Sequence, residues 1–499
     1  MPDFSAVTWP EVFVSNASIS KAVSEAVERG RLRKIGSRLY TRNLTEAPER
    51  LVRRNWYQLL TGYFPDALIA DRTALENKPA SDGSVFLVSE KQNEVQLPGL
   101  VLRPRRGKRP IETDKPFIGG ARLASTARAY LENMKSSRAR DGRVSRTLAR
   151  WELEQRLDAL LRLHGEQALN KLRDDARIIA PSLELGVEYT ALADLIGTLL
   201  GTRFARTDSA VGKARVAGQP YDPDRIALFE ALFGALRETI PPTRPASATE
   251  GDAASNLAFF ESYFSNFIEG TEFTVNEARE IVFEGTIPME RPEDAHDVLG
   301  TFRIVSNRQE MRTIPNTSSE FEEILRRRHG ILMQGRPDKN PGRYKTKVNQ
   351  AGSTIFVAPE LVVGTFSRGF DFYRALEEPF QRAVFMMILV SEVHPFIDGN
   401  GRMARIMMNA ELLVAEQERI IIPTSYRTDY LDALKAFSKN GLPTPVIRML
   451  EVAQEYTSRI DWSNFDGAFR MLEESNAFAA GSGEKLEFNR FSPKPPIYR

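Results

Sequence analysis

The chain has 499 residues, 42% of them hydrophobic and 27% charged, which is enough for two to four globular domains with apolar cores. Its 68 basic and 66 acidic residues leave a net charge of only +2, so no overall field favours nucleic acid or membranes as partners. The absence of cysteine excludes disulfides, thiolate zinc sites and cysteine nucleophiles, and it fits a reducing compartment.

The sequence shows no signal for export or membrane insertion. It begins without a basic stretch followed by an apolar one, so no secretory signal is predicted. The longest apolar run, from Ala383 to Val390, is far shorter than the roughly 20 residues that cross a bilayer. We therefore expect a soluble, cytoplasmic protein without a membrane partner.

The N-terminal region predicts a helix followed by a hairpin. Apolar residues recur at helical spacing from Ile19 to Gly30, and the glycine suits a helix C-cap. Residues 31–42 then alternate as a small hairpin does. Basic residues gather here and again at 103–110, which is the pattern of phosphate contacts but also of a solvated helix face. Those of the first cluster are Arg29, Arg31, Arg33, Lys34, Arg38 and Arg42.

The middle of the chain carries helical periodicity without a catalytic cluster, so residues 116–245 are predicted to form a helical connector domain. Proline and small residues are concentrated in 241–255, which indicates a linker or domain boundary. After about Asp461 the chain becomes polar and rich in turn residues, and 461–499 is predicted to be a partly ordered tail.

One short stretch, HPFIDGNGRMAR from His394 to Arg405, combines several chemically active residue types. The preceding segment, 377–393, is apolar on nearly all sides, which predicts a buried core helix that ends near Pro395. Helical spacing resumes after the loop, so a second helix is predicted to begin near Gly401 or Arg402. The stretch is therefore expected to form a helix–loop–helix turn.

Such a loop is suited to bind an anion. Unpaired backbone amides and the positive end of the helix dipole face it. Gly399 and Gly401 let the backbone approach phosphate oxygens where a Cβ would collide. Arg402 and Arg405, three residues apart on the first turn, are both expected to reach the same phosphate chain.

Two further residues supply the remaining chemistry. Asp398 lies at the edge of the loop, where a carboxylate can hold Mg²⁺ against two phosphates. His394 is the group whose ordinary pKa suits removal of a proton from an alcohol near neutral pH. The stretch thus predicts a base, a metal ligand and a phosphate cradle.

Three other interpretations fit less well. GNGRMA matches the dinucleotide-binding pattern G-x-G-x-x-A, but a helix precedes it instead of a strand, and the acid of ERIIIP stands before the apolar run. The ATPase loop motif fails because GILMQGRP has Arg-Pro where Lys-Ser/Thr is required. A capped turn with solvated arginines would explain half of the motif but not the whole set.

The stretch resembles the signature of the Fic (Fic/Doc) family, H-P-F-x-D-G-N-G-R-x-x-R. The matching residues are His394, Pro395, Phe396, Asp398, Gly399, Asn400, Gly401, Arg402 and Arg405. The resemblance implies a largely helical core that transfers AMP from Mg·ATP to a protein hydroxyl with release of pyrophosphate. It implies that His394 is the general base on a Ser, Thr or Tyr of the target, that Asp398 holds Mg²⁺, and that Phe396 anchors the loop.

The resemblance also assigns the phosphate contacts. Asn400, together with the amides of Gly399 and Gly401, would form the anion hole. Arg402 and Arg405 would hold the outer phosphates. The loop keeps D-G-N-G-R, from which family members that act as kinases depart, so AMP transfer is favoured.

Upstream, SNFIEG resembles the inhibitory motif of the family, [S/T]-x-x-x-E-[G/N], with Ser265, Glu269 and Gly270 at the matching positions. An apolar stripe from Leu257 predicts a helix that ends there, with Gly270 as its cap. The resemblance implies that Glu269 pairs with Arg405, so that ATP binds unproductively. The simpler interpretation is a surface carboxylate in a last helical turn.

Between the two motifs, residues 344–360 hold two β-prone runs separated by a turn signal at 350–352, which predicts a hairpin. In the family, such a flap lies over the active site and pairs with an extended target segment. We therefore expect Val348, Ile355 and Phe356 at the docking surface, with an ordinary packed hairpin as the alternative.

The N-terminal stretches GRLRKIGSRLYTR and PDALIADRTALE resemble the winged-helix start of AbiEi-type antitoxins and related bacterial regulators. We thus expect a mainly α protein: a helical Fic core with a β-hairpin flap, plus a small α/β winged-helix-like N-terminal domain. The expected domains are 1–115, which binds DNA or a partner, the connector 116–245, the Fic domain with its inhibitory helix at 246–460, and the tail 461–499.

The expected activity is autoinhibited transfer of AMP from ATP, with Mg²⁺, to a protein hydroxyl, the chain itself included. The alternative is a DNA-binding regulator whose Fic domain senses a ligand or uses another nucleotide. Removal of AMP from a target by the same site also stays open.

Overall fold

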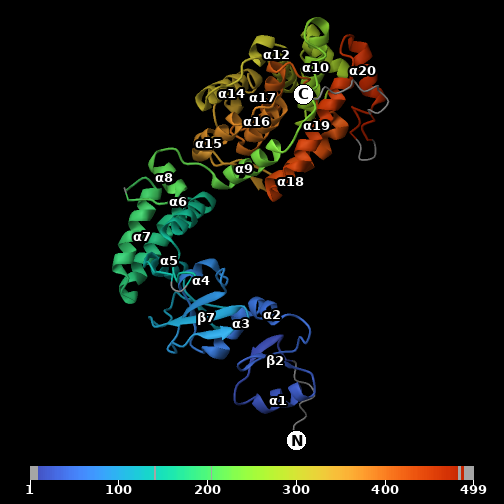
Figure 1. The fold of residues 1–499 in the computed structure, drawn as a ribbon. Coiled ribbons are helices and arrows are strands. Elements are labelled where there is room, and N and C mark those ends of the chain that lie inside the picture. Colours follow the sequence, from blue (N-terminus) through green and yellow to red (C-terminus); the bar gives the residue numbers. More distant parts are fainter. Residues whose placement is uncertain (1–8, 140–141, 204, 481–484, 488–499) are drawn as a thin grey trace. The chain divides into compact units, whose positions relative to one another are not determined.

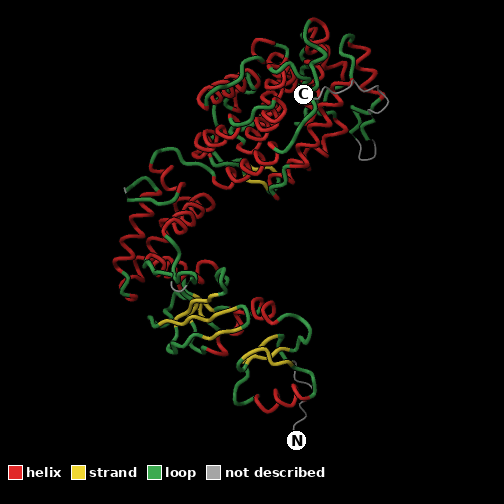
Figure 2. The backbone as a smooth tube through the Cα atoms, viewed as in Figure 1, coloured by secondary structure: helices red, strands yellow, loops and turns green. Residues whose placement is uncertain are grey.

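The computed structural model describes residues 9–139, 142–203, 205–480 and 485–487, and the chain divides into two compact units, Met1–Gly218 and Gln219–Arg499. Helices predominate, and the larger strands lie in the N-terminal half of the first unit, so the expected mainly α fold with a small β region is confirmed (Figures 1 and 2). In the described part of the chain, no helix combines the length and hydropathy needed to cross a membrane.

The first unit begins with a three-stranded sheet. Strands β1 (Val12–Val14), β3 (Leu39–Thr41) and β2 (Arg33–Gly36) pair antiparallel in that order, and helix α1 (Ser20–Glu28) connects β1 to β2. Gly30, just after the helix, has a φ of +67°, which glycine adopts without strain. The predicted helix followed by a hairpin is confirmed.

A six-stranded sheet follows and crosses the boundary predicted at residue 115. Its order is β6-β7-β5-β4-β9-β8, with β5 parallel to β7 and β4 parallel to β9. The strands are β4 (Leu68–Ile69), β5 (Ser84–Val88), β6 (Val95–Leu97), β7 (Leu100–Arg105), β8 (Lys115–Pro116) and β9 (Arg122–Leu123). Since β8 and β9 complete this sheet, the boundary at 115 is wrong. Strands of two residues are too short to produce a periodic signal.

One apolar core joins the two sheets. Val12 and Leu39 of the first sheet pack in the same cluster as Leu68 and Leu87 of the second. The accompanying helical segments are α2 (Pro48–Arg54), α3 (Trp56–Tyr63), α4 (Asp71–Glu76), η2 (Ile118–Gly120) and α5 (Thr126–Met134). The sheets are therefore parts of one packed region, and a winged helix within it stays a prediction.

The rest of the first unit is helical. Helices α6 (Arg150–Leu183), α7 (Gly186–Leu199) and α8 (Ala210–Val216) follow, and α6 and α7 pack with α5 in a separate apolar cluster. Helix α6 is interrupted at Gly165, whose φ is +75° and ψ 179°. The unit ends at Gly218, so the predicted connector 116–245 does not continue as one domain to residue 245.

The second unit is built around two adjacent helices, α16 (Pro379–Val393) and α17 (Asn400–Val414). Most of α16 is buried, which confirms the predicted core helix. The other α-helices are α9 (Pro223–Arg237), α10 (Gly251–Ile268), α11 (Val275–Arg279), α12 (Pro292–Val305), α13 (Arg308–Met311), α14 (Ser318–Leu332), α15 (Val362–Arg374), α18 (Arg427–Asn440), α19 (Thr444–Arg459) and α20 (Phe465–Glu474). Shorter elements are η3 (Glu280–Glu284), η4 (Pro337–Lys339), β10 (Gln350–Ala351), β11 (Thr354–Ile355), η5 (Pro359–Leu361) and η6 (Thr424–Tyr426).

The proline-rich segment 241–255, predicted as a linker or boundary, lies inside the second unit. Pro245 forms a β-bridge with Gln417, and the amide of Ala246 bonds the carbonyl of Glu416, just after α17. Helix α9, before this segment, packs against α15 and α16. A boundary at this segment is therefore wrong, because the same composition suits an extended stretch that is bonded to a neighbouring element.

The segment predicted as a partly ordered tail, 461–499, contains the packed helix α20. The ring of Phe465 lies 5.1 Å from that of Phe259 and 5.2 Å from that of Phe260, both on α10. Residues 461–480 are thus part of the second unit, whereas 481–484 and 488–499 lie outside the described residues.

Candidate active site

The predicted helix–loop–helix turn is present at the centre of the second unit. Helix α16 ends at Val393, and His394 follows in a left-handed conformation with a φ of +52°. Gly399, with a φ of +76°, precedes α17, which begins at Asn400. Because the loop is short, His394 lies at the same end of the helix pair as the N-terminus of α17.

His394 has one ring nitrogen engaged. Its Nδ1 lies 3.2 Å from the carbonyl oxygen of Ser391, and only a protonated Nδ1 can donate this bond. The neutral tautomer that the bond favours carries its lone pair on Nε2. Burial lowers the pKa of His394 to about 4, and the positive charge of Lys345 adds to this effect. The imidazole is therefore neutral near pH 7 and can accept a proton at Nε2.

The side chain of Asn400 holds the loop together. Its amide oxygen accepts a bond from the Phe396 amide at 2.9 Å, and its amide nitrogen donates to the Phe396 carbonyl at 2.9 Å. The first intrahelical bond of α17 runs from Met403 to Gly399, so the backbone amides before Met403 have no partner within the helix. An anion bound here would meet these amides, and Asn400 would act by positioning them.

Arg405 is bound by the last turn of α10. Its Nη2 lies 2.7 Å from Oε1 of Glu269 and donates to the Ser265 carbonyl at 2.8 Å, while its Nε donates to Ser265 Oγ at 2.9 Å. Its Nη1 also lies 3.4 Å from the hydroxyl of Tyr430. Burial works to lower the pKa of Arg405, but Glu269 and Tyr430 together outweigh it and the pKa is raised. The predicted pairing of Glu269 with Arg405 is confirmed.

The carboxylate of Glu269 also lies against the anion loop. A Cβ placed on Gly401 would meet Glu269 Oε1 at 2.2 Å, so only glycine permits this approach. Gly270, with a φ of +94°, ends α10 directly after this residue. Glu269 thus places a negative charge beside the backbone where the motif predicts phosphate.

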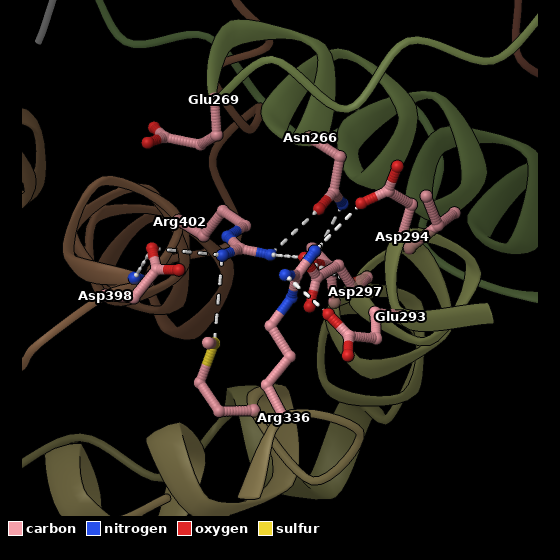
Figure 3. A network of polar contacts seen from close by, with 12 residues as sticks. Asn266, Glu269, Glu293, Asp294, Asp297, Arg336, Asp398 and Arg402 are labelled. Atoms are coloured by element: carbon pink, nitrogen blue, oxygen red, sulfur yellow. Dashed lines mark hydrogen bonds and ion pairs between the residues drawn. The ribbon is translucent and has the colours of Figure 1, made fainter. Parts of the chain in front are cut away.

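Arg402 has a separate set of partners, which we call the Asp297 network (Figure 3). Its Nη1 lies 2.9 Å from Asp297 Oδ2 and 3.3 Å from Asn266 Oδ1. The same Asp297 oxygen accepts a bond from Arg336 Nε at 2.9 Å. Figure 3 shows Glu269 outside this network. Helix α10 contacts both arginines that were predicted to share a phosphate chain, but their carboxylate partners differ: Asp297 of α12 for Arg402, and Glu269 for Arg405.

Asp398 offers a partly free carboxylate at the edge of the loop. Its side chain is 41% exposed, its Oδ1 accepts a bond from the Gly399 amide at 2.6 Å, and Arg402 Nη2 lies 3.6 Å away. Among the described residues there is no group of three His, Cys, Asp or Glu side chains that could hold a metal. Mg²⁺ commonly takes one or two carboxylates and completes its shell with phosphates and water. Asp398 therefore fits a nucleotide-bound Mg²⁺ but not a metal held by protein alone.

The predicted hairpin is present next to His394. Strands β10 and β11 pair antiparallel, with Gln350 opposite Ile355. Val348 is 53% exposed and Ile355 59% exposed. Phe356 instead stacks on the imidazole of His394, with ring centroids 3.8 Å apart and planes 6° apart. The flap thus combines an exposed apolar surface with a direct contact to the candidate base.

Sequence reasoning missed three residues that hold the loop. Lys345 and Asn349, in the part of the flap that precedes β10, bond backbone carbonyls of the loop. His329 of α14 stacks on Phe396 with ring centroids 3.6 Å apart. Its Nδ1 accepts from the Gly342 amide at 2.9 Å, so Nε2 donates to the Asp398 carbonyl at 3.0 Å. Lys345 and Asn349 belong to the predicted hairpin, but no sequence pattern singles out any of the three, so only the tertiary structure shows their role.

The comparisons with known proteins agree with the motif. Residues 319–412 match the Fic/DOC family. The chain is 27% identical over 219 residues to "Protein adenylyltransferase Fic" of Nematostella vectensis, which covers 43% of this chain and 51% of that protein. It is 23% identical over 248 residues to the protein of the same name from Drosophila willistoni, 48% of each. The chain thus spans about half the length of these curated relatives.

Solved structures similar to this chain are Fic proteins. Fic-1 from C. elegans is 19% identical, with a TM-score of 0.37, and the match covers 64% of this chain and 92% of that chain. A Fic family protein from Desulfovibrio desulfuricans is 20% identical, with a TM-score of 0.36, and covers 52% and 77%.

Proposed function

We propose that this chain, whose residues 319–412 form a Fic/DOC family domain, transfers AMP from ATP to a hydroxyl of a protein and is held inactive by Glu269. The observation that carries the proposal is the 2.7 Å ion pair between Glu269 and Arg405 beside the loop of His394. The names of the relatives, protein adenylyltransferases, support the activity.

In the proposed reaction, the target hydroxyl oxygen attacks the α-phosphorus of ATP. The bond from that phosphorus to the bridging oxygen breaks, and pyrophosphate leaves. His394 takes the hydroxyl proton at Nε2, which its neutral tautomer leaves free as an acceptor. The Ser391 carbonyl fixes this tautomer and orients the ring.

The start of α17 binds the phosphates. The backbone amides of Gly401 and its neighbours and the helix dipole stabilise negative charge there. Arg405 reaches the outer phosphates once Glu269 has left, and Arg402 contributes positive charge from within its network. Asp398 would hold Mg²⁺, which supplies positive charge against the phosphates when bound.

Glu269 inhibits the reaction in two ways: it occupies the donors of Arg405, and it places a negative charge where phosphate would bind. While Arg405 donates to Glu269 and Ser265, it cannot donate to a γ-phosphate. The carboxylate against Gly401 repels phosphate oxygens from the same backbone. ATP then lacks an outer-phosphate contact, and its α-phosphorus is not aligned with the attacking oxygen.

A protein target fits the flap. Its exposed apolar side chains are Val348, before β10, and Ile355, within β11, and an extended segment can add to these short strands by main-chain bonds. Because such bonds are independent of side chains, several target sequences can dock, including a segment of a second copy of this chain. The stacked Phe356 connects the docking surface to His394.

The test is labelling of purified protein with Mg²⁺ and α-labelled ATP. We compare the wild type, Glu269→Gly, Glu269→Gly with His394→Ala, and Glu272→Gly as a matched control, since Glu272 is an exposed carboxylate three residues from Glu269. We expect strong labelling of Glu269→Gly only, and its loss in the double variant. Equal labelling of wild type and Glu269→Gly would contradict the inhibition. Absence of label from every variant that still binds ATP would contradict AMP transfer.

A second proposal, DNA binding by the first unit, rests on a different observation. Arg29, Arg31, Lys34, Arg38 and Arg42 are all exposed around α1 and the β2–β3 hairpin. If they contact phosphates, affinity for duplex DNA falls steeply with salt. Fluorescence anisotropy of labelled duplex at several salt concentrations tests this, with reversal of Arg31 and Lys34 to Glu expected to abolish binding. Binding that persists in this variant would exclude the hairpin as the contact.

A further inference from the structure

The backbone of His394 needs an external restraint. Its φ of +52° lies in the left-handed region, which is unfavourable for a residue with a Cβ. Residues held in this region persist where surrounding contacts over-determine them. The contacts that fix His394 therefore decide where its imidazole points.

Three consecutive carbonyls of this turn are bonded by the part of the flap that precedes β10. Lys345 Nζ donates to the His394 carbonyl at 2.7 Å, and the Lys345 amide donates to the Pro395 carbonyl at 2.8 Å. Asn349 Nδ2 donates to the Phe396 carbonyl at 2.8 Å. The turn thus has a continuous set of donors on one side.

Lys345 is an unusual donor because it is buried without an acidic partner. Its exposed fraction is 3%, and none of the ion pairs found among the described residues includes it. Its other close acceptors are neutral: Asn349 Oδ1 at 2.6 Å and the Val393 carbonyl at 3.4 Å. Burial lowers its pKa to about 7, and the nearby charge of Arg225 adds to this effect. Burying an amine in this way is costly, so a hydrophobic residue would suit a role in packing alone.

We propose that Lys345 is a positioning residue for the reaction: it holds the carbonyl of His394, so that the left-handed turn presents the imidazole to the target hydroxyl. The inference rests on the proposed function of His394 as the base. It concerns orientation of the base, since Lys345 bonds the backbone of His394 and not its ring.

The same contacts couple the base to the flap. Asn349 lies directly before β10, and Lys345 lies earlier in the same segment. Phe356, directly after β11, stacks on the imidazole. Asn349 also accepts a backbone bond from Phe356 at 3.2 Å. A target strand that adds to the flap is therefore placed relative to His394 through these residues.

The kinetic test uses the released Glu269→Gly background. We compare Lys345→Met, Lys345→Arg and, as a matched control on the same segment, exposed Lys347→Met. We expect Lys345→Met to lower kcat roughly 100-fold with the KM for ATP within about twofold, because misplacement of a catalytic group by about 1 Å costs this much. Lys345→Arg restores most of the rate, since a guanidinium can donate to the same carbonyl. Lys347→Met leaves the rate unchanged.

A second measurement does not depend on activity. The chain has four histidines, so a spectrum of ¹³C-labelled imidazoles is simple, and His394→Ala assigns the relevant signal. Stacking on Phe356 shifts the His394 signal away from its position in a flexible chain. We expect Lys345→Met to move this signal toward that position and to leave the His164 and His296 signals in place, whereas Lys347→Met moves none.

The outcomes separate the two proposals. If Glu269→Gly transfers no AMP but the His394 signal moves in Lys345→Met, the proposed function fails while Lys345 still holds the turn. An unchanged kcat together with an unchanged His394 signal overturns the inference. If Lys345→Met does not fold, Asn349→Ala replaces it in both measurements, since it removes the bond to the Phe396 carbonyl. We expect a smaller fall in kcat and a smaller shift of the His394 signal. If Asn349→Ala changes neither, the inference is overturned.

Discussion

Arg402 and Arg405 lie one turn apart on α17, yet their surroundings differ in kind. Arg405 is bound by Ser265 and by Glu269, a carboxylate 30% exposed at the end of α10. Arg402 is bound by Asp297, which is 3% exposed and also holds Arg336. The side chain of Glu269 can turn toward solvent while Arg405 keeps its bonds to Ser265. Asp297 is instead enclosed between Arg402 and Arg336.

From this difference we propose that the Glu269 contact regulates the site and that the Asp297 contact holds it together. A partly exposed carboxylate costs less to displace than a buried one, because Arg405 keeps its bonds to Ser265 when Glu269 leaves, so a ligand or partner can compete for its place. A buried carboxylate between two guanidiniums is expensive to remove, because each charge left behind loses its partner in a dry environment. We therefore expect Glu269 to act as a switch and Asp297 as a constant part of the fold.

The largest expected effect is on stability, which should fall more when Asp297 is removed than when Glu269 is removed. Asp297→Ala should lower the free energy of unfolding of the second unit by about 3 kcal/mol, because buried Arg402 and partly buried Arg336 both lose an acceptor. Glu269→Ala should cost about 1 kcal/mol or less. Urea unfolding followed by circular dichroism measures both. Equal losses would remove the distinction between the two sites.

Transfer activity should respond more strongly to a change at Glu269 than to a change at Asp297, the reverse of the order expected for stability. Glu269→Gly should raise AMP transfer about 50-fold, within the usual range of coupling between a regulatory contact and an active site. Asp297→Asn, which keeps the shape of the side chain, should not raise it. Initial rates with labelled ATP give the answer, with thermal unfolding curves to show that both variants are folded. Activation by Asp297→Asn would make Asp297 a second inhibitory residue.

The pH dependence of stability should depend on His329, a buried residue that holds the loop. Burial lowers the pKa of His329 from 6.5 to about 4, so between these values the unfolded chain binds a proton that the folded chain does not. Stability therefore falls as the pH decreases through this window. The share of His329 is about 1 kcal/mol between pH 6.5 and 5.5. His329→Gln should show a shallower slope in parallel urea titrations, and an unchanged slope would contradict a neutral, buried His329.

The smallest expected effect concerns Ser265 and its share in restraining Arg405. Ser265→Ala removes one bond to Arg405 Nε but leaves Glu269 in place. Loss of one hydrogen bond should weaken the restraint only partly, so we expect activation of about threefold. The rate of Glu269→Gly should not rise further when Ser265→Ala is added. Full activation by Ser265→Ala alone would show that the serine, not the carboxylate, restrains Arg405.

Predictions from the sequence succeeded where neighbours in the chain decide the structure. The apolar segment before His394 is the buried helix α16, and the glycine-flanked loop leads into α17 as predicted. The pairing of Glu269 with Arg405 was predictable only through the family resemblance, since nothing local connects α10 to α17. The proline-rich stretch 241–255 misled the domain assignment, because composition does not tell a linker from an extended segment bonded at Pro245 and Ala246.

The sequence by itself determined the chemical groups of the candidate site and the turn that carries them, because residue type and helical spacing are local properties. Only the tertiary structure decided the partners of these groups. Asp297 meets Arg402, and Lys345 meets the His394 carbonyl, across elements far apart in the chain. Such contacts arise when helices pack, and packing sets both the burial that lowers the pKa of His394 and the restraint that keeps its backbone left-handed.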